Sequence, residues 1–155
     1  MDKDTRGVMF SSKTGVWATP QDFYDKLDRL YGPFTLDPCA NAENAKTANY
    51  FTEADDGLAQ DWSGNVVFCN PPYNNMKDWS KKCRDEALKS DTTVVLLCPA
   101  RTDTRYFHDS IMFADEIFFI KGRLKFGGSK NSAPFPSMVA VFRGSPPPKI
   151  STMER

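Results

Sequence analysis

Two continuous apolar runs of strand length constrain the fold of this chain most. Residues 66–69 read VVFC and residues 94–98 read VVLLC, with no polar side chain at alternate positions. A strand that is apolar at every position is buried on both faces, which is typical of a mostly parallel sheet covered by helices on both sides. Both runs are much shorter than the roughly 20 apolar residues of a membrane span. The pattern therefore predicts an α/β domain and gives no sign of a membrane protein.

Two segments outside these runs have the pattern of amphipathic helices. In residues 19–32 we expect Thr19 to cap a helix and Pro20 to occupy its first position. Residues 76–90 carry apolar side chains every three to four positions, as the buried side of a second helix does. These helices are long enough to cover the predicted strands.

Two further strands are expected near the C-terminus, in residues 116–128 and 136–144. The sequence between them contains no helical pattern, so a parallel crossover is excluded and the two strands should pair antiparallel. The predicted fold is therefore an α/β domain with a mostly parallel central sheet, helices on both faces and an antiparallel hairpin at one edge.

The 155 residues are enough for one compact domain. We assign residues 1–15 to a flexible N-terminal arm and residues 16–144 to a single domain. Residues 145–155 contain three consecutive prolines and are expected to be a tail without regular structure. The N-terminus has acidic residues and no apolar core, so it does not resemble a secretory signal.

The four cysteines have no C-x-x-C spacing, and the single histidine, His108, has no cysteine beside it. We therefore expect no metal site, and we expect reduced thiols, as in an intracellular protein.

The net charge is zero, but the charges are unevenly distributed along the chain. Residues 1–116 contain 13 Lys and Arg against 19 Asp and Glu, whereas residues 117–155 contain 7 against 1. The basic C-terminal third is suited to contact with a polyanion. The alternative is that these cations are the solvated edge of the sheet, where lysines prevent strands from aggregating.

The sequence Asn70-Pro71-Pro72-Tyr73 directly follows the first apolar run. In open α/β sheets, ligands bind at the carboxyl ends of the strands. The prolines keep the segment extended and have no N–H, so the Asn70 amide oxygen and the Pro71 carbonyl can act as a pair of acceptors. Such a pair suits an –NH2 group, and Tyr73 offers a flat face to an aromatic ring. The alternative is an ordinary turn, since Asn before Pro is a common turn signal.

A second polar group follows the short apolar stretch at residues 33–36. There, the Asp37 carboxylate can accept hydrogen bonds from an amine or a hydroxyl of a ligand, although it can also cap a turn. The chain has no G-x-G-x-x-G sequence, which argues against an ordinary dinucleotide site and leaves a small nucleoside-like cofactor.

The motifs WATPQDFYDKL, FTLDPCA, YFTEADDGLAQDW, VVFCNPPY, CPARTDTRYFHD and KGRLKFGG occur in this order. Together they resemble the small phage-type DNA N6-adenine methyltransferases, from about Trp17 to Gly144. The resemblance implies a Rossmann-like class I methyltransferase fold and S-adenosylmethionine as cofactor. It implies that Asn70, Pro71, Pro72 and Tyr73 hold the target base. The cofactor pocket is expected to include Trp17, Thr19, Pro20, Asp37, Pro38, Cys39, Asp55, Asp56 and Asn70.

The expected partner is double-stranded DNA, from which the target adenine must be flipped out of the stack. Six cations are candidates for phosphate contacts: Arg101, Arg105, Lys121, Arg123, Lys125 and Lys130. For Arg101 and Arg105 the alternative is pairing with Asp103 or Asp109. A homodimer that shares DNA contacts is plausible for so small a chain, and a phage-encoded enzyme would act in the cytoplasm of its bacterial host.

The Asn-Pro-Pro-Tyr corner alone leaves other substrates open. An RNA adenine and a protein glutamine also present an –NH2 on a planar carbon. A catalytically silent nucleic-acid-binding subunit of the same fold is a further alternative.

Overall fold

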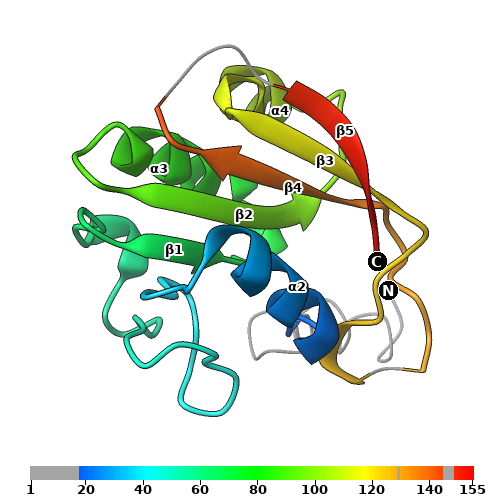
Figure 1. Ribbon diagram of the computed structural model, residues 1–155, viewed down its shortest axis with the longest axis horizontal. Helices are drawn as coiled ribbons and strands as arrows, with labels where there is room; N and C mark the ends of the chain where they lie inside the picture. Colours follow the sequence, from blue (N-terminus) through cyan, green and yellow to red (C-terminus); the bar gives the residue numbers. More distant parts are fainter. Residues whose placement is uncertain (1–17, 129, 145–148) are drawn as a thin grey trace.

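The fold is built around a single five-stranded sheet. The computed structural model describes residues 18–128, 130–144 and 149–155 (Figure 1). Within these residues the strands follow the order β1-β2-β4-β3-β5 across the sheet. Their bounds are β1 Val66–Cys69, β2 Thr93–Pro99, β3 Glu116–Lys121, β4 Ser137–Phe142 and β5 Lys149–Glu154.

Four of the five strands run in the same direction. β1 pairs parallel with β2, and β3 pairs parallel with β5, whereas β4 is antiparallel to both of its neighbours, β2 and β3. Beyond β1 the sheet continues only as isolated parallel bridges, from Leu36 to Val67 and from Asp37 to Tyr50. The mostly parallel α/β sheet is therefore confirmed, and the short apolar stretch at residues 33–36 contributes a single bridge, at Leu36.

Two expectations about the C-terminal part of the chain are wrong. The antiparallel pair does not form the edge of the sheet, and residues 149–154 form a strand instead of an irregular tail. β3 and β4 do pair antiparallel, but β4 lies between β2 and β3, and β5 covers the other side of β3. The prolines precede this last strand instead of interrupting it, and Ile150, Thr152 and Met153 suit a strand with one buried face. The predictions for residues 1–15 and for residues 145–148 lie outside the described residues.

Helices cover both faces of the sheet, as expected. α2, Gln21–Tyr31, packs on one face, and α3, Met76–Ala87, and α4, Arg105–Asp109, lie on the other (Figure 1). Side chains alternate along β1, so that Val67 and Cys69 join the core beneath α3 while Phe68 joins the core beneath α2. None of the helices in the described part of the chain has the length and apolarity of a membrane span.

Short 3₁₀ turns connect these elements. Two of them border the carboxyl edge of the sheet, and the other two follow Asp56 and α4. They are η1 Gly57–Ala59, η2 Tyr73–Asn75, η3 Ile111–Phe113 and η4 Phe126–Gly128.

The helix predictions differ from the structure in their end residues. Leu30 and Leu88, expected on the buried sides of the helices, are 57% and 68% exposed. Leu30 lies in the last turn of α2 and Leu88 directly follows α3. Thr19 does not cap α2: its hydroxyl is instead engaged with Asn70.

The carboxyl ends of β1, β2 and β3 meet at one edge of the sheet because these strands run in the same direction. The segment after β2 is joined to the loop before β4 by a 2.9 Å hydrogen bond from the Ala100 N–H to the Pro136 carbonyl. The Tyr73 ring, after β1, contacts Phe126 and Phe135 of the same loop in T-shaped geometry. Three segments that are distant in the sequence are therefore held together at this edge.

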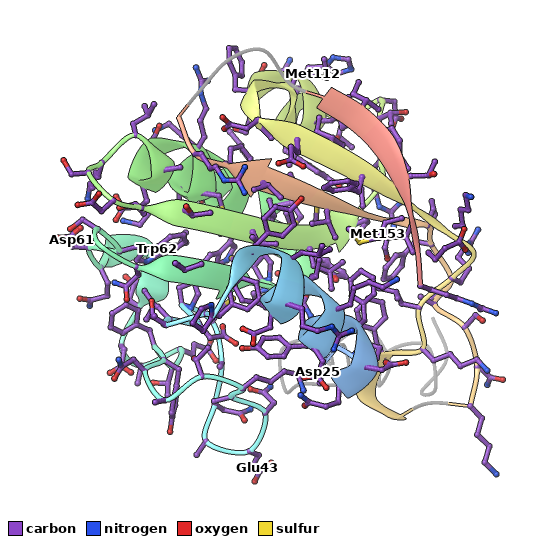
Figure 2. The ribbon with its side chains drawn as sticks, in the orientation of Figure 1. Asp25, Glu43, Asp61, Trp62, Met112 and Met153 are labelled. Atoms are coloured by element: carbon purple, nitrogen blue, oxygen red, sulfur yellow. The ribbon has the colours of Figure 1, made fainter. Side chains whose placement is uncertain are left out.

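A buried carboxylate anchors the segment that follows Asp56. Glu86 of α3 is 2% exposed and accepts a hydrogen bond of 2.6 Å from the Trp62 N–H. Its carboxylate also forms ion pairs with Lys82 and Lys89. Trp62 is labelled in Figure 2. Its indole N–H donates to the Gly57 carbonyl at 2.9 Å. Glu86 therefore holds Trp62, and Trp62 holds the turn at Gly57.

Replacement of Glu86 by Ala should lower the free energy of unfolding by about 2–4 kcal/mol, since it leaves a buried N–H without its acceptor and removes the charge that Lys82 pairs with. Urea unfolding followed by circular dichroism measures the change. The control is Asp85→Ala, which removes the exposed ion pair to Lys81 and should cost less than about 0.5 kcal/mol. Equal losses in the two variants would show that Glu86 is not a structural anchor.

Candidate active site

A cavity of about 1180 Å³ opens beside the end of β1. It is larger than the roughly 300–1,000 Å³ of a typical ligand pocket, so it has room for a cofactor and part of a second molecule. Four segments that are far apart in the sequence form its walls, and Phe68 and Trp79 supply aromatic surface. The segments are residues 18–19, 37–46, 52–58 and 70–75.

The Asn70 side chain lines this cavity and has a defined orientation. Its Nδ2 donates to the Thr19 hydroxyl at 3.0 Å, and its Oδ1 accepts from the Tyr73 hydroxyl at 2.7 Å. In this arrangement the Tyr73 hydroxyl donates to the amide oxygen and the Thr19 hydroxyl accepts from the amide nitrogen. An amide oxygen has two lone pairs and can in general accept two hydrogen bonds.

Tyr73 takes a different position from the one expected. It is not among the residues that line the cavity in the described structure; its ring is packed against Phe126 and Phe135. Burial raises the pKa of its hydroxyl well above the usual value, so the group stays protonated and remains a donor to Asn70 at neutral pH. In this conformation Tyr73 orients the amide.

The two prolines that follow Asn70 shape the same corner. Pro71 and Pro72 both line the cavity, and Pro72 has the extended conformation of φ −57° and ψ 130°. The Pro72 carbonyl accepts from the Asn75 N–H at the start of α3. Among the described residues no donor approaches the Pro71 carbonyl within hydrogen-bonding distance, which leaves it as an acceptor.

Asp37 also lines the cavity, and its backbone forms the isolated β-bridge to Tyr50. Its Oδ1 accepts from the Cys39 N–H at 3.1 Å. Burial raises the pKa of its carboxyl to about 6, and the bond to Cys39 and the charge of Lys46 only partly offset this effect. Asp37 is therefore a carboxylate at neutral pH that gains a proton readily in mild acid.

Cys39 also lines the cavity, with its Sγ 3.8 Å from the Sγ of the buried Cys69. Burial raises the pKa of both thiols. They are therefore protonated at neutral pH and poor nucleophiles, as expected of cysteines that serve for packing.

The walls of the cavity are strongly acidic. Besides Asp37, three carboxylates line it, from Glu43, Glu53 and Asp56, and among the described lining residues Lys46 is the single cation. Asp56 adopts the left-handed conformation at φ 56°, which Asp tolerates better than most residues. Sequence reasoning did not identify Lys46, Glu43 or Glu53. Lys46 and Glu43 lie between the motifs in a segment without regular structure, and Glu53 lies in the motif YFTEADDGLAQDW next to the acidic residues that were chosen instead.

The expected cofactor residues separate into three groups. Thr19, Asp37, Pro38, Cys39, Asp56 and Asn70 all line the cavity. Pro20 precedes α2 and does not line it in the described structure; Asp55 is exposed and accepts hydrogen bonds from Thr52. Trp17 lies outside the described residues.

The six expected DNA-binding cations also differ from one another. Lys121 forms an ion pair of 2.9 Å with Glu154, and Arg123 donates to the Ala133 carbonyl at 3.1 Å, so both have structural partners. The other four side chains are exposed and make no ion pair or hydrogen bond with the described residues; in particular, no pairing with Asp103 or Asp109 is found. These are Arg101, Arg105, Lys125 and Lys130.

Comparison with known proteins identifies the family. The model of the DNA N-6-adenine-methyltransferase (Dam) family matches residues 8–153. The chain therefore belongs to this family, and it is an adenine-specific DNA methyltransferase, as the ordered motifs predicted. Members of a methyltransferase family use S-adenosylmethionine in general.

Two relatives are similar in sequence. The DNA N-6-adenine-methyltransferase of Haemophilus phage HP1 is 28% identical over 150 residues, which cover 92% of this chain and 87% of that protein. The YfdM protein of Escherichia coli (strain K12) is 41% identical over 63 residues, 37% of this chain and 69% of its own length. Among solved structures, a predicted O-methyltransferase from Agrobacterium tumefaciens is 15% identical, with a TM-score of 0.41; the similarity covers 88% of this chain and 64% of that one.

The raised pKa of Asp37 gives a pH-dependent prediction. An unfolded Asp has a pKa of about 3.9. Folding therefore stabilises the protonated form of Asp37 relative to the charged form. Above about pH 6 the charged carboxylate lowers the free energy of unfolding. This loss disappears as the pH falls toward 4. Asp37→Asn should therefore stabilise the unliganded protein more at pH 7.5 than at pH 4.5, by about 1–3 kcal/mol. Urea unfolding at the two pH values tests this, and an equal effect at both would contradict the raised pKa.

Proposed function

We propose that this chain transfers a methyl group from S-adenosylmethionine to the N6 amino group of adenine in double-stranded DNA, and that Asn70 and Pro71 hold that amino group. One observation supports the assignment most strongly. The Asn70 carboxamide lines the cavity, with its nitrogen bonded to Thr19 and its oxygen bonded to Tyr73. Next to it in sequence is the Pro71 carbonyl, a second acceptor in the same cavity wall.

The cavity suits this cofactor in size and in charge. S-adenosylmethionine is a cation overall, and the lining contains four carboxylates against one lysine. Asp37 and Asp56 can accept hydrogen bonds from the amine and hydroxyl groups of such a ligand, and Trp79 and Phe68 provide planar apolar surface for a nucleobase. When bound, the cofactor supplies an electrophilic methyl group on a sulfonium.

The protein residues act on the amino nitrogen of the base. That nitrogen is a weak nucleophile because its lone pair is delocalised into the ring. Hydrogen bonds from the amino group to the Asn70 oxygen and the Pro71 carbonyl stabilise the positive charge that grows on nitrogen during attack. Because Asn70 is already oriented, little reorganisation is needed when the base arrives.

Tyr73 has two roles in this proposal. Its hydroxyl bonds to Asn70 before the base arrives, and its ring can offer an aromatic surface to a flipped base. Stacking requires the ring to turn from its contacts with Phe126 and Phe135 toward the cavity. This movement releases the Asn70 oxygen to the base, while Thr19 continues to hold the amide nitrogen. Stacking would offset part of the few kcal/mol that base flipping costs.

The DNA backbone is proposed to lie across the loops after β2 and β3. Arg101, Arg105, Lys125 and Lys130 are exposed there without partners among the described residues. A homodimer would extend this surface to more phosphates. The bacterial cytoplasm, where the host DNA is, is the proposed location.

Replacement of Asn70 by Ala should reduce methyl transfer at least about 100-fold, the typical cost of removing one preorganised hydrogen-bonding group at a reacting centre. Labelled S-adenosylmethionine is incubated separately with unmethylated DNA, RNA and protein, and the DNA is digested to nucleosides. Wild type should produce N6-methyladenine in DNA. The control Asn49→Ala changes an exposed amide outside the cavity and should leave the rate unchanged. Undiminished activity in Asn70→Ala, or transfer only to RNA or protein, would contradict the proposal.

The four unpartnered cations predict a specific change in the salt dependence of DNA binding. Each Ala substitution at Arg101, Arg105, Lys125 or Lys130 should weaken binding and reduce the slope of log K against log salt by about 1. Fluorescence anisotropy at several salt concentrations measures the slope. Lys121→Ala is the matched control, since its ammonium is paired with Glu154; an equal reduction of its slope would show that the two classes of cation do not differ.

A further inference from the structure

We propose that Lys46, held by Gln21, is the residue that binds the carboxylate of the cofactor's amino-acid moiety. The inference rests on the proposed function, because it assigns one end of the S-adenosylmethionine pocket. Gln21 belongs to the motif WATPQDFYDKL, whereas Lys46 lies outside the motifs that indicated the family.

The Lys46 ammonium is held at a defined place in the cavity wall. Its Nζ donates to the Gln21 Oε1 at 2.9 Å, and the Gln21 Nε2 donates to the Asp25 Oδ1 at 2.8 Å. Nζ also lies 5.8 Å from the centroid of the Tyr24 ring. Figure 2 shows Asp25 on α2 and Glu43 on the loop that leads to Lys46. The loop and the helix therefore meet at this lysine.

The charge environment indicates that Lys46 is there for an anion. It is the single cation among the described lining residues, beside four carboxylates, yet it forms no ion pair within 4.0 Å with any described residue. Four other lysines do form such pairs: Lys81, Lys82, Lys89 and Lys121. An ammonium has three N–H donors, and Gln21 occupies one of them. Two donors are left for a carboxylate of a ligand.

The position along the chain identifies which end of the cofactor this is. Thr19, which holds Asn70, and Gln21, which holds Lys46, are two residues apart, so their Cα atoms are at most about 7 Å from each other. In the cofactor, only a short carbon chain separates the sulfonium from the carboxylate. If the methyl group lies near Asn70, the carboxylate is therefore within reach of Lys46, and the adenosyl group extends toward Glu53, Asp56 and Trp79.

A purely structural role for Lys46 is the competing explanation. In that role it would connect the loop at residues 41–47 to α2 through Gln21 and Tyr24, and its loss would weaken the binding of every ligand equally. The ligand-binding and structural explanations can be distinguished by measuring how Lys46 variants bind ligands with and without a carboxylate.

The test is isothermal titration calorimetry with two ligands, S-adenosylhomocysteine and the same molecule without its carboxylate. Wild type should bind the complete ligand about 10–100-fold more tightly, the ratio for a charge-assisted hydrogen bond of 1.5–3 kcal/mol. Lys46→Met should bind S-adenosylhomocysteine about 10–100-fold more weakly than wild type and bind the truncated ligand with unchanged affinity. Lys46→Arg should recover part of the loss, and Lys77→Met, on the exposed side of α3, should behave as wild type.

The outcomes separate this inference from the proposed function. If wild type binds neither ligand, the assignment of the cofactor pocket fails, and the inference fails with it. If wild type binds both ligands equally, or Lys46→Met loses affinity for both equally, the carboxylate subsite is wrong while the pocket assignment stands. Thermal unfolding checks that Lys46→Met is folded; if it is not, the same comparison of ligands in Lys46→Gln and Lys46→Arg decides.

Discussion

The two hydrogen bonds of the Asn70 carboxamide connect the parts of the chain that form the active site. Thr19 belongs to the segment that leads into α2, Asn70 follows the central strand β1, and Tyr73 begins the turn into α3. The amide is therefore held at both ends before any substrate arrives. The same contacts bring α2 toward the cavity, and with it Gln21 and Lys46.

The acidic and basic side chains that are unevenly distributed along the sequence also lie on different parts of the structure. Acidic side chains from the N-terminal two-thirds line the cavity, where they suit a cationic cofactor. Basic side chains after β2 and β3 lie on exposed loops at the same edge, where they suit phosphates. Other cations of the C-terminal third form ion pairs within the protein. Lys121 pairs with Glu154, and Arg143 pairs with Glu116. Under the proposed function, these charges would attract the cofactor and the nucleic acid to adjacent but different surfaces.

The sequence predicted the elements with strong local patterns and missed those decided by distant contacts. The buried strands β1 and β2, the helices α2 and α3 and the corner after β1 were identified from apolar runs, helical spacing and proline. The insertion of β4 between β2 and β3 could not be predicted, because strand order depends on partners and not on local preference. β5 was missed because three prolines precede it. Thr19 was expected to cap α2, and only the fold reveals that Asn70, 51 residues away, takes its hydroxyl. No local sequence pattern identified Lys46, because its proposed role depends on carboxylates that only the fold brings around it.

The central claim is that Asn70 and Pro71 together accept the hydrogen bonds of the target amino group. A crystal structure of the protein with double-stranded DNA and S-adenosylhomocysteine tests it most directly. The account predicts an adenine turned out of the helix, with its N6 within about 3.2 Å of both the Asn70 Oδ1 and the Pro71 carbonyl oxygen. A complex in which the base lies elsewhere, or in which the amide nitrogen of Asn70 faces N6, would contradict it.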